Sequence, residues 1–137
     1  MSTLSVTDWA PSSPEIVIGE NERRHVTVAA LTDVVHGSDH MDFLLYELDR
    51  AKVVPDAMVP PDVVRLGSMV RYWAAPGEER TIKLVMPSQV ELPGNYRLAV
   101  TSAHGAALLG LKAGAVMTWL DPDGTTHRIE VLQVANP

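Results

Sequence analysis

The spacing of apolar residues changes along the chain, from a helical period in the first half to a strand period in the second. Within residues 20–35, apolar side chains recur at intervals of three or four: Val28, Leu31, Val34 and Val35. This spacing is typical of one buried side of a helix, and Gly37 favours the end of that helix. We therefore expect a helix over residues 20–35 whose Val28 side faces the core.

A second helical pattern runs from about His40 to Val54. Its apolar positions fall at i, i+3, i+4, i+7 and i+10: Met41, Leu44, Leu45, Leu48 and Ala51. Ser38 or Asp39 is suited to cap its N-terminus, and Pro55 follows its end. Two helices joined by a few residues pack as antiparallel neighbours. Residues 20–54 thus predict a short antiparallel helical hairpin, or coiled coil, about 22 Å long at 1.5 Å per residue.

Polar, proline-containing sequence flanks this hairpin on both sides. We interpret residues 1–19 as a flexible lead-in, in which residues 15–18 (EIVI) either add an edge strand or anchor the first helix. Residues 55–62 (PDAMVPPD) hold three prolines among polar residues, a composition typical of a semi-rigid linker. We take the linker to span residues 55–66.

After Leu66 the apolar period becomes two. Alternation in residues 69–74 and 80–86, with a Pro-Gly pair at 76–77 between them, predicts a β-hairpin. Further strands are expected at 96–101, 115–120 and 127–134, a short small-residue helix at 104–111, and a tight turn at 121–124 (DPDG). The predicted fold class is α+β, in which residues 67–137 form a small antiparallel sheet with one short helix packed on it.

Composition narrows the classes of function. A chain of 137 residues is one domain, or one domain with a small appendage. The absence of cysteine excludes disulfides, zinc fingers and thiol catalysis. No run of about 18 apolar residues and no signal-peptide pattern is present, so we expect a cytoplasmic protein without a membrane partner.

Charge adds a difference between the two halves. The net charge of −6 argues against a free-standing nucleic-acid binder, because neutralising phosphates requires a basic patch. Residues 1–66 hold eleven of the 17 acidic residues but five of the 11 Lys and Arg residues. This asymmetry indicates two parts with different roles.

Several segments, taken together and in order, resemble one known family. They are ELDRA at 47–51, PDVV at 61–64, SMVRY at 68–72, GAALLGLKAG at 105–114, and DG at 123–124 followed by IEVL at 129–132. This set is similar to the Gre transcript-cleavage factors and, more closely, to the Rnk-type regulators of nucleoside diphosphate kinase, over roughly residues 20–134. The resemblance implies an N-terminal coiled coil, a C-terminal domain with the fold of FK506-binding prolyl isomerases (FKBP-like), and binding to bacterial RNA polymerase.

The resemblance also implies where the polymerase would be contacted. In Gre factors the C-terminal domain docks at the rim of the secondary channel, and the coiled coil enters the channel. The loop formed here by Thr101, Ser102, Ala103 and His104 matches the family's polymerase-contact loop, and we expect it to bind the polymerase. Gre factors typically have Ser-Pro there, often after an acid and with an Arg slightly downstream, whereas this chain has Thr101, Ala103 and Ala106 at those positions.

The predicted hairpin tip allows two interpretations. In Gre factors, acids at the tip help to hold a catalytic magnesium ion, and Asp39 and Asp42 would be the corresponding pair. The alternative, which we favour, is that Asp39 caps the helix and Asp42 is a first-turn charge that suits the helix dipole. His36 and His40 with Asp39 would supply a small metal site, but exposed tip histidines are the ordinary explanation, and no metal or cofactor is expected.

Two sets of aromatic residues also have alternative roles. Trp73 and Trp119 either floor a ligand pocket or, as we favour, pack in the core or an interface. Phe43 and Tyr46 lie off the main apolar stripe of their helix, where they either pair with another chain or cover the sheet. We expect a monomer.

Three functions remain open at this point. The favoured one is a non-catalytic regulator that binds RNA polymerase near the secondary channel and competes with Gre factors, since a hairpin of about 22 Å should fall short of the active centre. The alternative is an elongation factor that stimulates transcript cleavage through Asp39 and Asp42. A remote third is a prolyl isomerase or peptide-binding module.

Overall fold

The computed structural model describes residues 14–32, 38–90, 96–121 and 123–137, with the backbone alone for residues 38–41. In chain order the elements are β1 (Val17–Gly19), α2 (Glu20–Thr32), α3 (Ser38–Arg50), β2 (Lys52–Val54), η1 (Asp56–Met58), β3 (Met69–Ala74), β4 (Glu78–Val85), η2 (Pro87–Gln89), β5 (Arg97–Ala99), α4 (Ala103–Leu108), β6 (Val116–Leu120) and β7 (Thr126–Ala135). Within those residues, no helix combines the length and apolar character needed to cross a membrane. The class is α+β.

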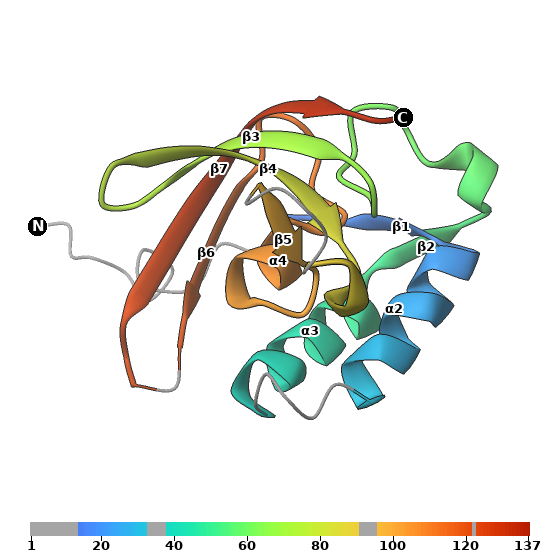
Figure 1. Cartoon of the computed structure of the whole chain (residues 1–137), viewed down its shortest axis with the longest axis horizontal. Helices are drawn as coiled ribbons and strands as arrows, with labels where there is room; N and C mark the ends of the chain where they lie inside the picture. The colour runs from blue at the N-terminus through green and yellow to red at the C-terminus, as the bar shows by residue number, and fades with distance from the viewer. Residues whose placement is uncertain (1–13, 33–37, 91–95, 122) are drawn as a thin grey trace, which may run out of the picture.

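A five-stranded sheet in the order β5-β4-β3-β7-β6 forms the larger part of the molecule. The β-hairpin predicted over residues 69–86 is confirmed, because β3 and β4 pair antiparallel with Val70 opposite Ile82. The period-two pattern also identified the core face, since Val70, Tyr72, Ile82 and Leu84 are all buried. The sheet curls around α4, which lies against its concave side (Figure 1).

The prediction of an all-antiparallel sheet is wrong at one edge. β5 pairs parallel with β4, with Leu84 opposite Leu98. A tight turn forces two strands to run antiparallel, whereas a longer connection can carry the chain back to the starting end. The connection that contains η2 does this here, so that β5 runs in the same direction as β4.

The first helix was predicted with the wrong buried face. α2 buries Glu22, Val26, Ala29 and Ala30, a stripe at i, i+4, i+7 and i+8. Val28 is 56% exposed and Leu31 67% exposed, although both were expected in the core. Val28 and Leu31 lie on the outer face because the inner face is formed by Val26, two alanines and one carboxylate. Val34, Val35 and the proposed helix end at Gly37 lie outside the described residues.

The second helix is shorter than predicted. α3 ends at Arg50, and Lys52–Val54 forms the strand β2. This strand pairs parallel with β1, with Val17 opposite Lys52. The β-branched Val53 and Val54 favour strand over helix, and their strand partner lies 35 residues earlier in the chain. The EIVI segment therefore contributes a strand, and residues 14–19 are part of the fold, contrary to the predicted flexible lead-in.

The buried core includes residues of the helices as well as the sheet. Leu44 and Leu48 of α3 and Val26 of α2 belong to the same buried cluster as Val70 and Tyr72 of β3. α2 and α3 lie side by side, and α3 packs beside α4 (Figure 1). The division into separate hairpin, linker and sheet domains, the coiled coil and the FKBP-like fold stay predictions.

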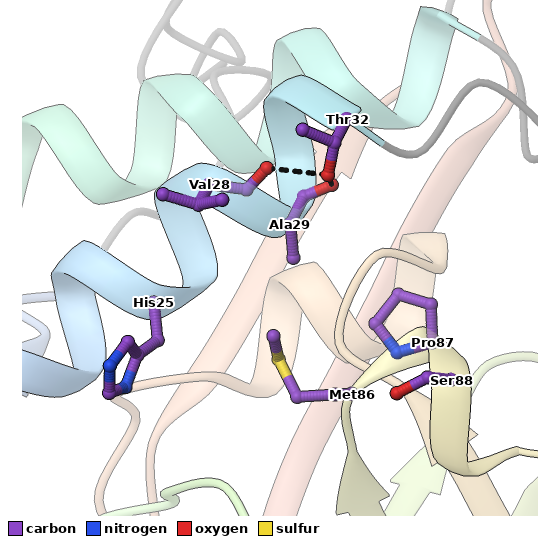
Figure 2. Close-up of a pocket in the computed structure, with 7 residues that line it drawn as sticks. All are labelled: His25, Val28, Ala29, Thr32, Met86, Pro87 and Ser88. Carbon is purple, nitrogen blue, oxygen red and sulfur yellow. Dashed lines mark hydrogen bonds between the residues drawn. The ribbon is translucent and has the colours of Figure 1, made fainter.

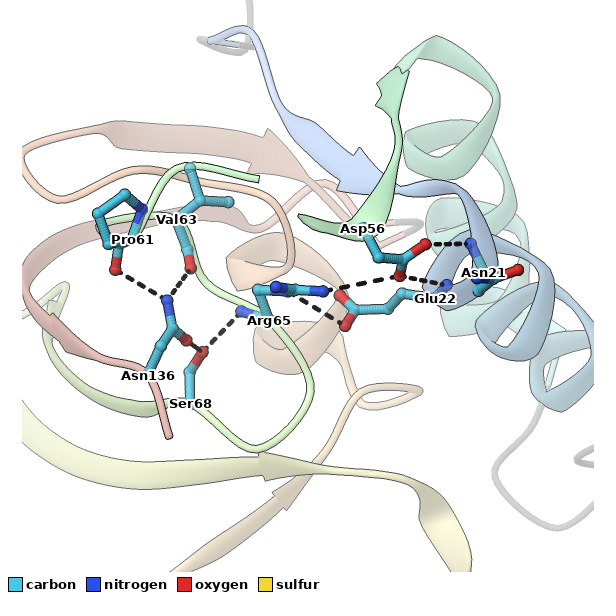
Figure 3. Close-up of polar contacts among 8 residues, drawn as sticks. All are labelled: Asn21, Glu22, Asp56, Pro61, Val63, Arg65, Ser68 and Asn136. Atoms are coloured by element: carbon cyan, nitrogen blue, oxygen red, sulfur yellow. Dashed lines mark hydrogen bonds and ion pairs between the residues drawn. The ribbon is translucent and has the colours of Figure 1, made fainter. Parts of the chain in front are cut away.

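Side-chain hydrogen bonds hold both ends of the predicted linker, residues 55–66, against the rest of the molecule. At its start, Asp56 accepts hydrogen bonds from the backbone N–H groups of Asn21 at 2.8 Å and Glu22 at 3.2 Å. It therefore caps the N-terminus of α2 from a distant part of the chain, as Figure 3 shows. Gly19 makes room for this cap, because a Cβ there would lie 2.5 Å from Asp56 Oδ2.

Arg65 connects the same carboxylate to the buried acid of α2. Its guanidinium group lies 3.6 Å from Asp56 Oδ2 and 3.7 Å from Glu22 Oε2. Burial raises the pKa of Glu22, and the charge of Arg65 opposes that rise. Arg65 thus provides the partner that a buried carboxylate requires.

The end of the segment is held against the C-terminus of the chain. Ser68 Oγ accepts a hydrogen bond from the Arg65 N–H at 2.7 Å and donates one to Asn136 Oδ1. The Asn136 amide donates in turn to the carbonyl oxygens of Pro61 at 2.8 Å and Val63 at 2.9 Å (Figure 3). These bonds give residues 61–68 a defined path across the molecule.

Candidate functional site

The predicted polymerase-contact loop, residues 101–104, leads into the N-terminus of α4. Ser102 is the N-cap: its Oγ accepts a hydrogen bond from the Gly105 N–H at 3.1 Å and donates one to the Ala99 carbonyl at 2.7 Å. Gly105 allows this close packing, because a Cβ there would lie 2.0 Å from the Ala99 carbonyl oxygen. The loop is therefore held rigidly between β5 and α4.

The four predicted contact residues differ in exposure. Thr101 is fully buried, so its side chain lies inside the molecule and not on the surface of the loop. Ser102, Ala103 and His104 are partly exposed and adjacent. Ala106, which stands where Gre factors carry an Arg, is also fully buried.

The side chain of His104 contacts residues of the sheet. Its Nδ1 lies 2.9 Å from the hydroxyl of Tyr72, a fully buried residue of β3. Arg80 of β4 donates a hydrogen bond to the same hydroxyl at 3.2 Å. Burial, followed by the nearby charge of Arg80, lowers the pKa of His104 below its ordinary value of 6.5, so the imidazole is neutral at pH 7.

Beside His104 lies a stack of aromatic rings centred on Trp119. Phe43 of α3 stacks on Trp119 with ring centroids 5.4 Å apart, and His127 of β7 also stacks on Trp119, at 5.1 Å. The His104 ring meets Trp119 edge-on at 6.2 Å. This stack joins α3, β6, β7 and the loop at residues 101–104 into one packed unit.

These contacts decide between several sequence-based alternatives. Trp119 is 6% exposed and packs in the core, whereas Trp73 is partly exposed and alternates with the buried residues of β3. The two tryptophans therefore lie on opposite faces of the sheet and floor no common pocket. Phe43 covers the sheet through Trp119, while Tyr46 is 62% exposed.

His127 also makes a hydrogen bond at the β6–β7 turn. Its Nε2 lies 2.6 Å from Asp121 Oδ2. The hydrogen bonds that the Asp121 carboxyl shares with Asp123 and His127 lower the pKa of Asp121 to about 2. The Asp121 carboxylate also accepts from the Thr125 N–H at 3.1 Å, so it organises the turn.

Two cavities lie on the surface near these elements. One, of about 480 Å³, is lined by His104 and the β3–β4 turn: Ala74, Ala75, Pro76, Gly77 and Glu78. The other, also about 480 Å³, lies between α2 and the start of η2, with Val28, Ala29, Met86 and Pro87 among its lining residues (Figure 2). The second cavity shares no residue with the loop at 101–104.

The predicted tip residues are described only in part. α3 begins at Ser38, but His36 and the side chains of Asp39 and His40 lie outside the described part of the chain, so the capping and metal-pair interpretations stay predictions. Asp42 is exposed. Among the residues that the structure describes, no group of three or more His, Asp or Glu side chains is arranged to hold a metal ion.

Sequence reasoning missed Tyr72 and Arg80 as partners of His104. The alternation correctly placed Tyr72 on the core face of its strand. It did not indicate that the Tyr72 hydroxyl contacts the imidazole of His104, 32 residues further along the chain. A tyrosine at a core position is a usable signal, because a buried hydroxyl needs a hydrogen-bond partner.

Comparisons with known proteins identify the family of the chain and structures with a similar fold. Residues 59–136 match the family described as "Transcription elongation factor, GreA/GreB, C-term". The chain is 33% identical over 124 residues to the "Regulator of nucleoside diphosphate kinase" of Escherichia coli K12, with 90% of each chain covered. Among solved structures, it resembles the "Prokaryotic transcription elongation factor GreA/GreB from Nitrosomonas europaea", with a TM-score of 0.65, 31% identity, and 90% of this chain and 99% of that chain covered.

A longer relative matches over part of its length. The transcription elongation factor GreA of Clostridium botulinum (strain Hall) is 32% identical over 87 residues, which are 64% of this chain and 54% of GreA. The chain therefore corresponds to about half of that elongation factor.

Proposed function

Because the chain belongs to the GreA/GreB C-terminal family of transcription elongation factors, we propose that it binds bacterial RNA polymerase near the secondary channel and regulates transcription without catalysing a reaction. The observation that carries this proposal is the rigid, partly exposed segment formed by Ser102, Ala103 and His104. Its N-cap, its glycine contact and its position between β5 and α4 give a preformed surface of the kind that needs little reordering on binding.

The geometry of the helices supports competition with Gre factors in place of transcript cleavage. α2 and α3 have 13 residues each, or about 20 Å of helix. Leu44 and Leu48 pack into the core that the sheet also lines, so much of α3 is engaged within the molecule. We propose that the helices do not reach the polymerase active centre and that the protein occupies the channel rim.

The relationship to the E. coli regulator suggests what this binding influences. We propose that any effect of this protein on nucleoside diphosphate kinase levels arises through transcription and not through contact with the kinase. A single preformed binding segment suffices for this role, and we propose that the protein acts as a monomer.

The direct test is co-migration of the purified protein with core RNA polymerase on a sizing column, with and without excess Gre factor. Binding that the Gre factor displaces is expected, and absence of binding contradicts the proposal. Ala103→Glu should abolish binding, because it places a charge on the partly exposed first residue of α4. Ala135→Glu, at the exposed far end of β7, makes the same chemical change elsewhere and should bind normally.

A backtracked transcription complex separates the two transcriptional roles. The competition model predicts no shortening of the transcript when the protein is added, and protection from a Gre factor added later. Shortening that disappears in the double variant Asp39→Ala/Asp42→Ala would instead assign the cleavage-stimulating role to the tip acids.

A further inference from the structure

Three side chains from three elements form a hydrogen-bonded series that ends at His104. Arg80 Nη1 donates to the Tyr72 hydroxyl at 3.2 Å, and that hydroxyl lies 2.9 Å from His104 Nδ1. Tyr72 is fully buried, so among the described residues these two side chains are the partners available to its hydroxyl group.

This arrangement determines which ring nitrogen of His104 carries the proton. A guanidinium group can only donate, so the Tyr72 oxygen accepts from Arg80 and keeps its own hydrogen for another acceptor. Nδ1 of His104 supplies that acceptor if it is unprotonated. The opposite tautomer would leave the phenolic hydrogen without an acceptor in a buried site, which is costly. His104 therefore carries its proton on Nε2.

The protonated nitrogen is open to solvent. Within the described part of the chain, no buried side-chain nitrogen or oxygen lacks a partner, and Nε2 of His104 makes no hydrogen bond there. It must therefore be accessible, and His104 lines the cavity beside the β3–β4 turn. The charged or titratable groups that face the ring from neighbouring elements are Arg80 and Glu78 of β4 and His127 of β7.

We propose that Tyr72 and Arg80 are positioning residues that hold His104 as a neutral Nε2–H donor, and that this N–H binds a main-chain carbonyl of the polymerase segment that docks at the cavity. A carboxylate is a poorer occupant, because Glu78 lines the same cavity, whereas Arg80 is not among its lining residues and donates to the buried Tyr72 hydroxyl. A neutral carbonyl accepts the hydrogen bond without that repulsion. The proposal rests on the polymerase binding argued above and names one hydrogen bond that contributes to it.

The tautomer can be measured in the protein alone by nitrogen-15 NMR of the histidine side chains at pH 7.5. The expected spectrum shows an unprotonated, hydrogen-bonded Nδ1 and a protonated Nε2 for His104. Tyr72→Phe should shift the Nδ1 resonance towards that of an imidazole without this bond, whereas Tyr46→Phe, the same change at an exposed tyrosine, should leave it unchanged. A protonated Nδ1 in the unmodified protein overturns the assignment.

Binding variants test the donor role. His104→Gln places an amide N–H near the position of Nε2, whereas His104→Asn reproduces the Nδ1 acceptor but not the outer donor. We expect His104→Asn to weaken polymerase binding about tenfold, as loss of one hydrogen bond does, and His104→Gln to retain most of it. Equal affinities for the two variants would contradict the donor role.

A double-mutant cycle tests whether Tyr72 acts through His104. Tyr72→Phe should weaken binding a few-fold when His104 is present and have no further effect in the His104→Asn background. Additive losses would show that Tyr72 acts independently and would overturn the positioning role.

The two proposals fail in different ways. If the unmodified protein does not bind polymerase, the proposed function is wrong and the donor role falls with it, although NMR still decides the tautomer. If it binds and His104→Asn binds equally well, polymerase binding stands and the His104 contact is wrong.

Discussion

The sheet and the N-terminal region of this protein are specified in different ways. Each strand from β3 to β7 was recognisable from its own residues. Two of the strand pairs, β3 with β4 and β6 with β7, are joined by short turns. The N-terminal elements instead depend on distant partners, because β1 pairs with β2 and Asp56 caps α2 from 35 residues away. The comparison teaches that an alternating strand or a hairpin can be recognised from its own residues, whereas pairings between distant segments, such as β1 with β2 or β3 with β7, cannot.

The largest expected effect lies in the sheet region, at Gly105. Gly105→Ala places a Cβ 2.0 Å from the Ala99 carbonyl oxygen, and the next nearest atoms, at 2.9 Å, are also backbone atoms of Ala99 and Val100, which leave little room to relax. We expect the free energy of unfolding to fall by more than about 3 kcal/mol, measured by urea denaturation. Gly124→Ala has no neighbour within 4 Å of the new Cβ and carries the left-handed backbone cost alone, so it should lose about 1 kcal/mol.

Leu48→Ala tests whether the two regions unfold together. Leu48 of α3 is 2% exposed and belongs to the shared core, so its truncation should cost about 2–3 kcal/mol. If the helices and the sheet are one cooperative unit, far-ultraviolet circular dichroism and tryptophan fluorescence will shift together in a single transition. Two separate transitions would show that the helices form an independent domain. Leu31→Ala, at an exposed position on α2, should change stability little.

Asp56→Asn tests the non-local cap on α2. The amide keeps one acceptor oxygen but loses the charge that faces Arg65 and the helix N-terminus. We expect a smaller loss of stability than for Leu48→Ala, with faster amide hydrogen exchange confined to the first turn of α2 and to η1. Asp62→Asn removes an exposed acid of the same segment and serves as the matched control. Equal exchange rates in the two variants would argue against the cap.

The smallest effect concerns pH and the sheet region. The pKa of His104 is lowered in the folded protein by burial and by Arg80, so below about pH 6.5 the unfolded chain binds a proton that the folded chain resists. The free energy of unfolding should therefore fall as pH drops from about 6.5, and be unaffected by this group at higher pH. Comparison with His104→Asn isolates the contribution, and identical pH profiles for the two proteins would contradict it.

The candidate site was partly predictable. Residues 101–104 were identified through the family resemblance, and their place at the start of a short helix agrees with the structure. The sequence did not indicate that Thr101 is buried, nor that His104 meets Tyr72 and Arg80. Those facts depend on how α4 packs against the concave side of the sheet, which no local pattern encodes.

The sequence by itself determined the α+β class, the β3–β4 hairpin and the core face of the sheet, because alternation and turn residues act over a few neighbouring positions. The family relationship was also recognisable from the sequence, through segments that match in order along the chain. The tertiary structure decided the buried face of α2, the strand at Lys52–Val54 and the parallel edge at β5. For α2 and for Lys52–Val54 the deciding partner lies far along the chain, and for β5 the path of the connection from β4 sets the strand direction. Glu22 is buried because Arg65 pairs with it, Val53 forms a strand because Ile18 lies opposite, and Leu98 lies in a parallel strand because the connection brings it opposite Leu84.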